Sequence, residues 1–303
     1  MPSMKHIAIA RDGSLWGIGK LDDSVLTMYG DAAYMGWITD RTGKAETVAP
    51  ESFFEAWCIN QAHEIWHATD AHTQTGTQWT KVATASGLAD ARTISVGVKD
   101  GTVWYADMKD GALYRRENQG WVKDPVGRAT LIAAVSKSEV WCVNTAGAVY
   151  HLSGRDWKQE GGVSGAKMIS VGQDGTIWYG KADGSLYWLE SGSWHKDATA
   201  KAVAVSVQDK NRVVCINAAG EAFGRNPQGA WEKIVEHGPD GDAWHYTVMS
   251  GDTLATVVAS KYHTNNWGKV NAIVEQVRVL SNLPDVHKIK PGDMLTMPAV
   301  SAS

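Results

Sequence analysis

The chain has 303 residues, a formal net charge of −4 from 29 basic and 33 acidic side chains, and 15 Trp against 3 Phe. This length allows one large or two modest domains, and the weak charge argues against a nucleic-acid or anionic-membrane surface. No run approaches the roughly 18 consecutive apolar residues of a transmembrane helix, and the apolar run near Met1 is too short for a secretory signal. We therefore expect neither a nucleic-acid partner nor membrane insertion.

The Trp and Gly residues recur in a pattern that divides most of the chain into repeats. Three segments share Asp-Gly-x-x-Trp, with their Trp at Trp16, Trp104 and Trp178. Three segments with Cys-x-Asn alternate with them, at Cys58, Cys142 and Cys215. A second Trp column follows each anchor, at Trp37, Trp79, Trp121, Trp157, Trp194 and Trp231. Between the two columns lies an aromatic in five units, at Trp66, Tyr114, Tyr150, Tyr187 and Phe223. The pattern indicates six repeats.

Each repeat has the length and turn signals of four short strands. In the third repeat we predict strands at about 94–98, 102–106, 112–116 and 120–123, with hairpin turns at Asp100-Gly101 and Asp110-Gly111. The first strand of each repeat carries small side chains, which suit a crowded central axis. Four strands per repeat and six repeats predict an all-β, six-bladed β-propeller. Its ends fall at blade boundaries, so packing between blades or oligomerisation must close the ring.

The three cysteines do not form a disulfide framework, because their number is odd and small and no CxxC is present. They fall in alternate blades, too far apart for bonding, so we expect three buried, free thiols. The chain also lacks Asn-x-Ser/Thr acceptors. These features predict synthesis in the cytoplasm without a signal peptide, and leave release or surface association by a non-classical route open.

The repeat resembles the tectonin repeat over about residues 5–236. The resemblance rests on Val-Gly-x-Asp-Gly-Thr-x-Trp followed by a turn, an aromatic and a second Trp, and it is clearest in the third and fifth units. Tectonins are small propeller lectins, and several recognise glycans of foreign cell surfaces, including O-methylated sugars. The resemblance therefore implies a propeller lectin.

Aromatic faces stack on the C–H faces of sugars, so some Trp columns are expected to expose a ring. Packing between blades is the alternative for each individual Trp. We select as candidate carbohydrate-binding residues of the propeller Trp16, Trp104, Tyr105, Trp178 and Tyr179. The fourth-strand Trp column, nearer the outer rim, is a further candidate.

After a linker at 237–243 the period changes, and residues 244–303 form a second predicted domain. A strand at His245–Val248 precedes a helix that Asp252 or Thr253 can cap. Asn266 begins a second helix, and a strand at Met294–Met297 ends at Pro298. The order predicts a small βααβ domain.

This segment resembles a LysM module, through motifs such as Gly-Asp-Thr-Leu after Tyr-x-Val, Trp-x-x-Val, Pro-Asp and Leu-x-Met-Pro. LysM modules bind N-acetylglucosamine polymers such as peptidoglycan or chitin. The residues that the resemblance assigns to the sugar groove are Gly251, Asp252, Thr253, Leu254, Pro284, Asp285 and Val286. An Asn usual near the end of the second helix is absent.

Two further patterns suggest chemistry. His63-Glu64-Ile65-Trp66-His67 fits the HExxH motif of zinc peptidases, which requires a helix. It aligns with the third strand of the second repeat, where the two His cannot share a metal. The Asp-Gly turns at Asp12, Asp100 and Asp174 fit hairpin geometry better than an acidic site. We expect no metal, no cofactor and no catalytic residue.

Three functions stay open from the sequence. The first is a non-enzymatic lectin whose propeller recognises surface glycans and whose LysM-like domain binds an N-acetylglucosamine polymer, a combination typical of defence. The second is an assembly scaffold, with a protein partner on the propeller and a structural joint in the C-terminal domain, as in phage-tail-like particles or cell-envelope complexes. The missing Asn favours it slightly. The third, an enzyme, rests on HExxH and any axial pocket.

Overall fold

The structure is a computed structural model. It describes residues 3–28, 37–69, 71, 77–226, 228–234, 244–248, 252–261, 270–271, 273–274, 277–278, 281 and 283–297. The chain divides into two compact units, which we describe separately. The larger comprises Pro2–Thr27 and Thr39–Ile234, and the smaller comprises Met1, Met28–Ile38 and Val235–Ser303. The linker predicted at 237–243 lies outside the described residues.

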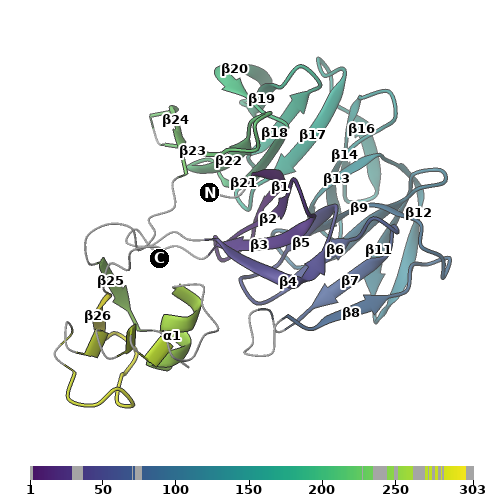
Figure 1. The fold of residues 1–303 in the computed structure, drawn as a ribbon. Coiled ribbons are helices and arrows are strands. Elements are labelled where there is room, and N and C mark those ends of the chain that lie inside the picture. Colours follow the sequence, from purple (N-terminus) through teal and green to yellow (C-terminus); the bar gives the residue numbers. More distant parts are fainter. Residues whose placement is uncertain are drawn as a thin grey trace. The chain divides into compact units, whose positions relative to one another are not determined.

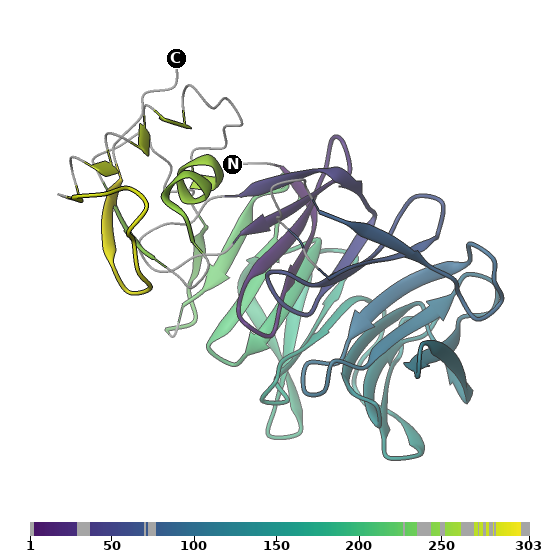
Figure 2. The same ribbon diagram turned by 90° about the horizontal axis from the view of Figure 1, so that it is seen from below.

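The described part of the propeller contains six four-stranded sheets, each with its strands hydrogen-bonded in chain order. They follow one another around a ring, as the colours from purple to green show in Figures 1 and 2. We number them blades 1 to 6. The prediction of a six-bladed propeller with four-stranded blades is confirmed.

The first three blades are formed by β1 to β12. Blade 1 contains β1 (Met4–Ile9), β2 (Leu15–Gly19), β3 (Ser24–Met28) and β4 (Ile38–Lys44). Blade 2 contains β5 (Thr47–Pro50), β6 (Ala56–Ile59), β7 (Ile65–Ala68) and β8 (Trp79–Val82). Blade 3 contains β9 (Ala91–Val96), β10 (Val103–Asp107), β11 (Ala112–Glu117) and β12 (Gly120–Arg128).

The remaining blades are formed by β13 to β24. Blade 4 contains β13 (Leu131–Ser136), β14 (Glu139–Val143), β15 (Val149–Ser153) and β16 (Asp156–Gln159). Blade 5 contains β17 (Ala166–Val171), β18 (Ile177–Lys181), β19 (Ser185–Glu190) and β20 (Ser193–Lys201). Blade 6 contains β21 (Ala204–Asp209), β22 (Arg212–Ile216), β23 (Ala222–Arg225) and β24 (Trp231–Lys233).

The predicted Asp-Gly hairpin turns are present. Gly101 has φ +73° and Gly111 has φ +73°, in the left-handed region that glycine adopts without strain. A side chain at Gly111 would also collide with the carbonyl oxygen of Ala129, 2.7 Å from the position of an added Cβ. The first strand of blade 3 lies at Ala91–Val96 rather than 94–98, because the Gly97 N–H already bonds the Thr102 carbonyl across the turn, at 2.8 Å.

The innermost strands β1, β5, β9, β13, β17 and β21 line an axial cavity with a volume of about 120 Å³. The lining contains the predicted small Ala, Ser and Val side chains together with Ile and four longer polar side chains, His6, Arg11, Gln173 and Gln208. Serines join neighbouring blades. The Ser95 hydroxyl accepts the Ala134 N–H at 3.0 Å, and the Ser170 hydroxyl accepts the Val207 N–H at 3.0 Å. The inner strands are thus tied to one another by side-chain hydrogen bonds.

The ring closes between blades 6 and 1 without a shared strand. The Ile9 N–H donates to the Ser206 hydroxyl at 2.9 Å, and the Met4 N–H donates to the Gly220 carbonyl at 3.0 Å. Farther out, the Arg212 guanidinium donates to the Gly13 carbonyl at 2.6 Å. The chain therefore seals its own ring by side-by-side contacts between blades.

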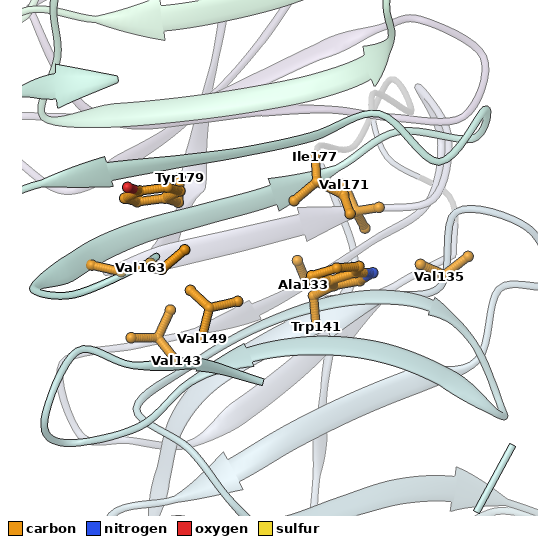
Figure 3. Close-up of a cluster of buried hydrophobic side chains, with 10 residues drawn as sticks. Ala133, Val135, Trp141, Val143, Val149, Val163, Val171, Ile177 and Tyr179 are labelled. Atoms are coloured by element: carbon orange, nitrogen blue, oxygen red, sulfur yellow. The ribbon is translucent and has the colours of Figure 1, made fainter. Parts of the chain in front are cut away.

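Buried clusters between adjacent blades hold the rest of the ring. In the cluster between blades 4 and 5, the indole of Trp141 and the side chain of Val149 face Val171, Ile177 and Tyr179 (Figure 3). Equivalent clusters join blades 1 and 2, 2 and 3, 3 and 4, and 5 and 6. The hydrophobic core of the propeller is thus divided among the interfaces between blades. Each interface is filled by side chains from the facing sides of two adjacent blades.

The smaller unit contains β25 (Trp244–Thr247), α1 (Leu254–Lys261) and β26 (Met294–Met297). β25 and β26 pair antiparallel, with Tyr246 opposite Leu295. The described residues at 270–271, 273–274 and 277–278 are helical, and Val270, Ile273 and Val277 join the buried cluster of the strands and α1. These elements occur in the predicted order, while the assignment to a LysM module stays a prediction. Among the described residues, no helix is both long and apolar enough to span a membrane.

Candidate functional site

The three Trp selected from the sequence as sugar-stacking residues are core residues. Trp16, Trp104 and Trp178 are at most 2% exposed. The Trp16 indole donates to the Ser52 carbonyl at 3.0 Å, and the Trp104 indole to the Ser136 carbonyl at 3.2 Å. Each of these two rings therefore reaches into the following blade. The expectation that they expose a ring face is wrong.

The two Tyr beside them are equally buried. Tyr105 and Tyr179 are each 1% exposed. Tyr105 stacks on Tyr114 with ring centroids 4.9 Å apart, and Tyr179 stacks on Tyr187 at 4.8 Å. Burial raises the pKa of Tyr179 to about 12. The second strand of a blade is covered on both faces by its neighbours, so its aromatics fill interfaces, and the expected solvent-facing rings are absent at these two positions as well.

Half-buried aromatics occur instead on the third and fourth strands, toward the outside of the blades. We define the outer aromatic rows as Trp66, Tyr114, Tyr150, Tyr187, Trp188 and Phe223 on the third strands and Trp79, Trp121, Trp157, Trp194 and Trp231 on the fourth. Trp188 lies 5.3 Å from the buried Trp178 and 5.5 Å from the exposed His195, measured between ring centroids. The outer aromatic rows are the part of the Trp pattern that solvent and a ligand can reach.

Buried aspartates fix the outer Trp at alternate interfaces. The indole N–H groups of Trp79 and Trp231 donate to the carboxylates of Asp40 and Asp197 at 2.7 and 3.1 Å. The Trp157 indole N–H donates to the Asp124 carboxylate at 3.3 Å. Burial by itself raises the pKa of Asp40, but hydrogen bonds from Thr42, the indole and Thr77 outweigh it and leave the pKa below its ordinary value. The pKa of Asp197 is lowered as well, so the Asp40 and Asp197 carboxylates are charged anchors of the fold.

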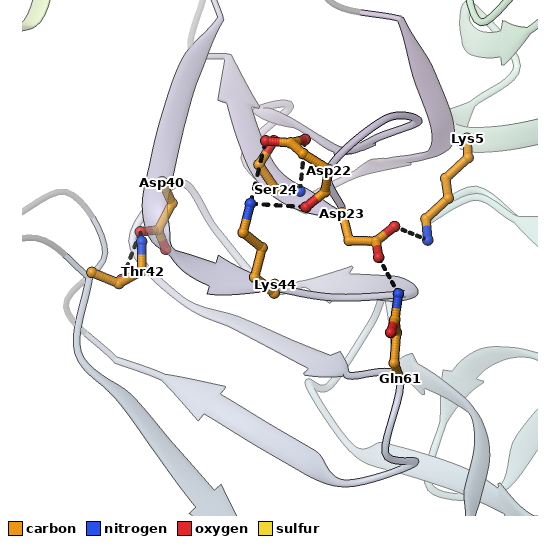
Figure 4. A network of polar contacts seen from close by, with 8 residues as sticks. All are labelled: Lys5, Asp22, Asp23, Ser24, Asp40, Thr42, Lys44 and Gln61. Carbon is orange, nitrogen blue, oxygen red and sulfur yellow. Dashed lines mark hydrogen bonds and ion pairs between the residues drawn. The ribbon is translucent and has the colours of Figure 1, made fainter.

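A polar network joins the outer part of blade 1 to blade 2 (Figure 4). Asp23 pairs with Lys5 at 2.5 Å and accepts a hydrogen bond from the Gln61 amide of blade 2. Asp22 accepts from Ser24 and lies 3.2 Å from the Lys44 ammonium group. Every charge drawn in Figure 4 has a partner within the network or the adjoining strands, so the network is structural.

The Asp-Gly turns confirm the structural interpretation and add an unpredicted role. In each, one carboxylate oxygen binds its own hairpin, and the other accepts a backbone N–H from the next blade. The second bonds are from Phe53 to Asp12 at 2.8 Å, from Lys137 to Asp100 at 2.8 Å, and from Lys210 to Asp174 at 2.9 Å. These aspartates therefore join blade 1 to blade 2, blade 3 to blade 4, and blade 5 to blade 6 by hydrogen bonds.

The second part of the HExxH segment lies on the third strand of blade 2, as predicted, while His63 and Glu64 precede that strand. His63 has φ +60°, and Ile65–Ala68 form β7. The His67 ring stacks on Trp57 at 3.9 Å and its Nε2 lies 2.9 Å from the Glu55 carboxylate. In the described part of the chain, no three His, Cys, Asp or Glu side chains converge as metal ligands.

The three cysteines are free and buried, as predicted. Burial raises the pKa of Cys58, Cys142 and Cys215 to about 12. A thiol protonated this strongly is a poor nucleophile. The cysteines therefore serve as small apolar side chains.

The axial cavity is too small for a sugar chain. Its volume of about 120 Å³ lies below the roughly 300–1,000 Å³ of typical ligand pockets. Arg11 stands at this cavity: its guanidinium donates to the Lys99 carbonyl at 3.3 Å, and its carbonyl accepts from Gln173 and Gln208. The candidate site is therefore on the outer aromatic rows.

Two arginines that the sequence reasoning missed lie close to aromatic rings at interfaces between blades. The guanidinium of Arg116 lies 5.3 Å from the ring centroids of both Trp57 and Trp121. That of Arg225 lies 5.4 Å from those of Trp178 and Trp188. Both arginines stand two residues after the aromatic residue of the third strand, Tyr114 or Phe223. The sequence analysis did not use this shared offset.

In the smaller unit, the predicted sugar-binding residues divide into core and surface. Gly251 lies outside the described residues. Leu254 is 1% exposed and belongs to the core. Asp252 accepts a hydrogen bond from the Tyr246 hydroxyl at 2.7 Å, and the Thr253 hydroxyl accepts the Thr256 N–H at 3.2 Å. Thr253 is thus the cap of α1, which is one of the two predicted caps.

The second predicted loop is more open. Pro284 is exposed, and the Asp285 carboxylate accepts the His287 N–H at 2.9 Å, which holds the pKa of Asp285 below its ordinary value. Val286 packs on the same buried cluster as Leu254. One hydrophobic core therefore supports both predicted loops.

Comparison with known proteins agrees with the propeller. The sequence model of the tectonin domain matches residues 128–239. The matched range covers blades 4 to 6. No curated protein matches the chain.

Solved structures share the fold at low sequence identity. A Bacteroides thetaiotaomicron protein of unknown function has a TM-score of 0.54 and 12% identity, covering 73% of this chain and 68% of that one. The WD40 β-propeller domain of Doa1 has a TM-score of 0.53 and 11% identity, covering 78% and 83%. Virginiamycin B lyase from Staphylococcus aureus has a TM-score of 0.50 and 15% identity, covering 79% and 89%. Identities this low show the propeller fold and no shared activity.

Proposed function

We propose that this protein is a non-enzymatic, lectin-type carbohydrate-binding protein, and that sugars bind on the outer aromatic rows. The observation that carries the proposal is the recurrence of half-buried aromatic rings on the third and fourth strands around the ring. Indole and phenol rings stack on the C–H faces of sugars. The tectonin match at residues 128–239 supports the proposal, because that family is associated with lectin-type binding.

The repetition of the rows has consequences for affinity and ligand. Several weak sites on one rigid ring bind a multivalent surface by avidity. An O-methyl group adds apolar area worth about 0.8 kcal/mol per buried carbon. We therefore propose cell-surface glycans, including O-methylated ones, as the propeller's ligands.

For the smaller unit we propose binding to N-acetylglucosamine polymers, such as peptidoglycan or chitin. Support comes from the LysM-like sequence and from a core that holds Leu254 and Val286 together below the two predicted loops. The surface residues proposed to contact the sugar are Asp252, Thr253, Pro284 and Asp285.

A glycan array probed with the full chain tests the proposal, with O-methylated and N-acetylglucosamine ligands included. Trp188→Ala is the test variant for the outer rows, and Leu21→Ala is its control, because Leu21 is 94% exposed and carries no ring. We expect Trp188→Ala to weaken binding to propeller ligands and Leu21→Ala to leave it unchanged. Retention on chitin and peptidoglycan, compared between the full chain and Asp285→Ala, tests the smaller unit. If the protein binds no glycan on the array and is retained on neither polymer, the lectin proposal is refuted.

One observation favours a second candidate, a protein-binding scaffold. Phe54, in the loop between β5 and β6, is 56% exposed, and its ring meets that of Phe53 edge-on at 5.1 Å. Exposed aromatic pairs are typical of protein interfaces. If no glycan binds, Phe54→Ala becomes the variant with which to test a protein partner.

A further inference from the structure

The guanidinium of Arg116, on β11, lies at the interface between blades 2 and 3, and we call this group with its two neighbouring indoles the Arg116 slot. The slot is bounded by the indole of Trp57 on β6 and the half-buried indole of Trp121 on β12, each 5.3 Å from the guanidinium carbon. Arg116 as a whole is half-buried, and one terminal nitrogen is buried with no hydrogen-bond acceptor. Among the described residues no carboxylate pairs with Arg116. Burial lowers the pKa of Arg116, so this cation lacks an internal counter-charge.

The interface between blades 5 and 6 shows the same arginine position with a carboxylate nearby, although one buried nitrogen of Arg225 also lacks a hydrogen-bond acceptor. Arg225 pairs across the strands with Trp231, as Arg116 pairs with Trp121. The guanidinium of Arg225 also lies near two indoles, those of Trp178 and Trp188, which stack on each other in blade 5. There, however, the Asp197 carboxylate of blade 5 lies 3.8 Å away.

One difference between the two interfaces that bears on the arginine is a side chain in the preceding blade. Asp197 stands three residues after the fourth-strand Trp194, and the equivalent position after Trp79 is Val82. The strand register supports this equivalence, because Lys196 pairs with Tyr187 and Lys81 pairs with Trp66 in the same aromatic column. Accordingly, the Trp231 indole donates to Asp197, whereas the Trp121 indole donates to the Ala83 carbonyl at 2.7 Å.

Two charged groups near the slot already have partners. The Glu55 carboxylate binds His67, and burial lowers the pKa of His67. On the opposite face of β11, Arg115 pairs with Glu117 at 2.7 Å. Lys123 is a further cation of blade 3, and its ammonium group lies 5.7 Å from the ring centroid of Tyr114. Among the described residues, an anion that reaches Arg116 displaces no carboxylate partner.

We propose that the slot binds the carboxylate of an acidic sugar, with Arg116 as the recognising group and the sugar ring against Trp121. A planar carboxylate matches the two parallel N–H groups of a guanidinium. This inference rests on the proposed lectin function, because it names the ligand class of one interface of the outer aromatic rows.

The experiment measures binding of the full chain by calorimetry to two acidic probes, trigalacturonic acid and sialyllactose. The methyl ester of each is the neutral partner, and an O-methylated neutral glycan from the array is the reference. We expect at least one acid to bind tenfold or more tightly than its ester. We also expect this preference to shrink as salt is raised.

Four variants locate the site. Arg116→Gln removes the charge, and Arg116→Lys keeps the charge but loses the planar fork. Both should weaken binding of the acid about tenfold or more, with the smaller loss for Lys. Arg115→Gln is the matched control on the adjacent residue and should bind as the parent does. Val82→Asp supplies the internal carboxylate that Arg225 already has, and should abolish the preference for the acid while the ring stays folded by circular dichroism.

The outcomes separate this inference from the function it rests on. If neither acid binds better than its ester, or if Arg116→Gln binds the acid as the parent does, the inference is wrong. If in that case the neutral reference glycan still binds, the lectin proposal stands. If no probe and no neutral glycan binds, both fail. Should Val82→Asp not fold, the comparison of Arg116→Gln with Arg115→Gln decides alone.

Discussion

The carboxylate of Asp174 in blade 5 accepts the backbone N–H of Lys210 in blade 6 at 2.9 Å, while its other oxygen accepts the Thr176 N–H of its own hairpin at 2.9 Å. One side chain thus builds a turn and joins two blades. The same arrangement recurs at Asp12 and Asp100. The Asp-Gly signature therefore carries information about contacts between repeats as well as within them.

Asp174→Asn should destabilise the propeller by about 1–2 kcal/mol, because the amide offers one acceptor where the carboxylate offers two and leaves a backbone N–H unsatisfied. Asp183→Asn is the control: Asp183 binds Ser185 within its own hairpin at 2.9 Å and makes no bond to another blade. Urea unfolding of both variants, followed by Trp fluorescence, measures the difference. An equal loss of unfolding free energy in the two variants would contradict a role of Asp174 in joining the blades.

Aspartates that accept hydrogen bonds in the folded protein predict loss of stability in acid. The pKa values of Asp40, Asp174 and Asp197 are below their ordinary value in the folded protein. A carboxylate whose pKa is lower in the folded than in the unfolded state stabilises the fold above its unfolded pKa, near 4, and loses this contribution as pH falls through the folded value. The melting temperature should therefore be flat near pH 7 and fall below about pH 4.

Asp197→Asn is the informative variant for this pH dependence. It should lower the melting temperature at pH 7 and reduce the further loss between pH 5 and 3, because one titrating group is gone. Asp156→Asn is the control, since Asp156 is exposed. An unchanged acid profile in Asp197→Asn would show that other groups cause the loss.

The sequence predicted the architecture because repetition reports on packing. Trp and Gly at fixed offsets fixed the number of blades, and small residues such as those around Ala133 marked the strands at the axis. The same repetition misplaced the binding residues. Trp104 and Tyr105 recur because each fills an interface between blades, and a ring used in packing has the same sequence pattern as a ring used in binding. Exposure is set by strand position in the blade, which only the assembled ring shows.

Arg116 was unpredictable for a different reason. Its environment is created by Trp57 from another repeat and by the absence of a carboxylate at Val82, and neither is visible in the residues around Arg116. In the smaller unit the reverse holds. The cap at Thr253 is a local feature, set by residues within one turn of the helix, so sequence reasoning placed it among two candidates.

The buried Trp column can be separated from the outer rows by stability. Trp104→Ala should cost about 3–5 kcal/mol, because the indole is 0% exposed and its N–H bonds the Ser136 carbonyl. Phe54→Ala, at 56% exposure, should cost far less. Urea denaturation of both measures this. If Trp104→Ala is as stable as the parent protein but does not bind glycans, then Trp104 belongs to the binding site.

The three thiols should not react with thiol reagents in the native protein. Burial leaves Cys58, Cys142 and Cys215 at most 3% exposed and raises the pKa of each to about 12. The thiolate is the reactive form, so an aromatic disulfide reagent at pH 8 should titrate close to zero thiols without denaturant. In urea, where the blades separate and the pKa returns toward 8.5, it should titrate all three thiols of the sequence. Because the cysteines lie in blades 2, 4 and 6, single Cys→Ser variants would show which blade opens first as urea is raised. Rapid labelling in the folded state would mean that at least one interface between blades opens readily, contrary to the packing seen here.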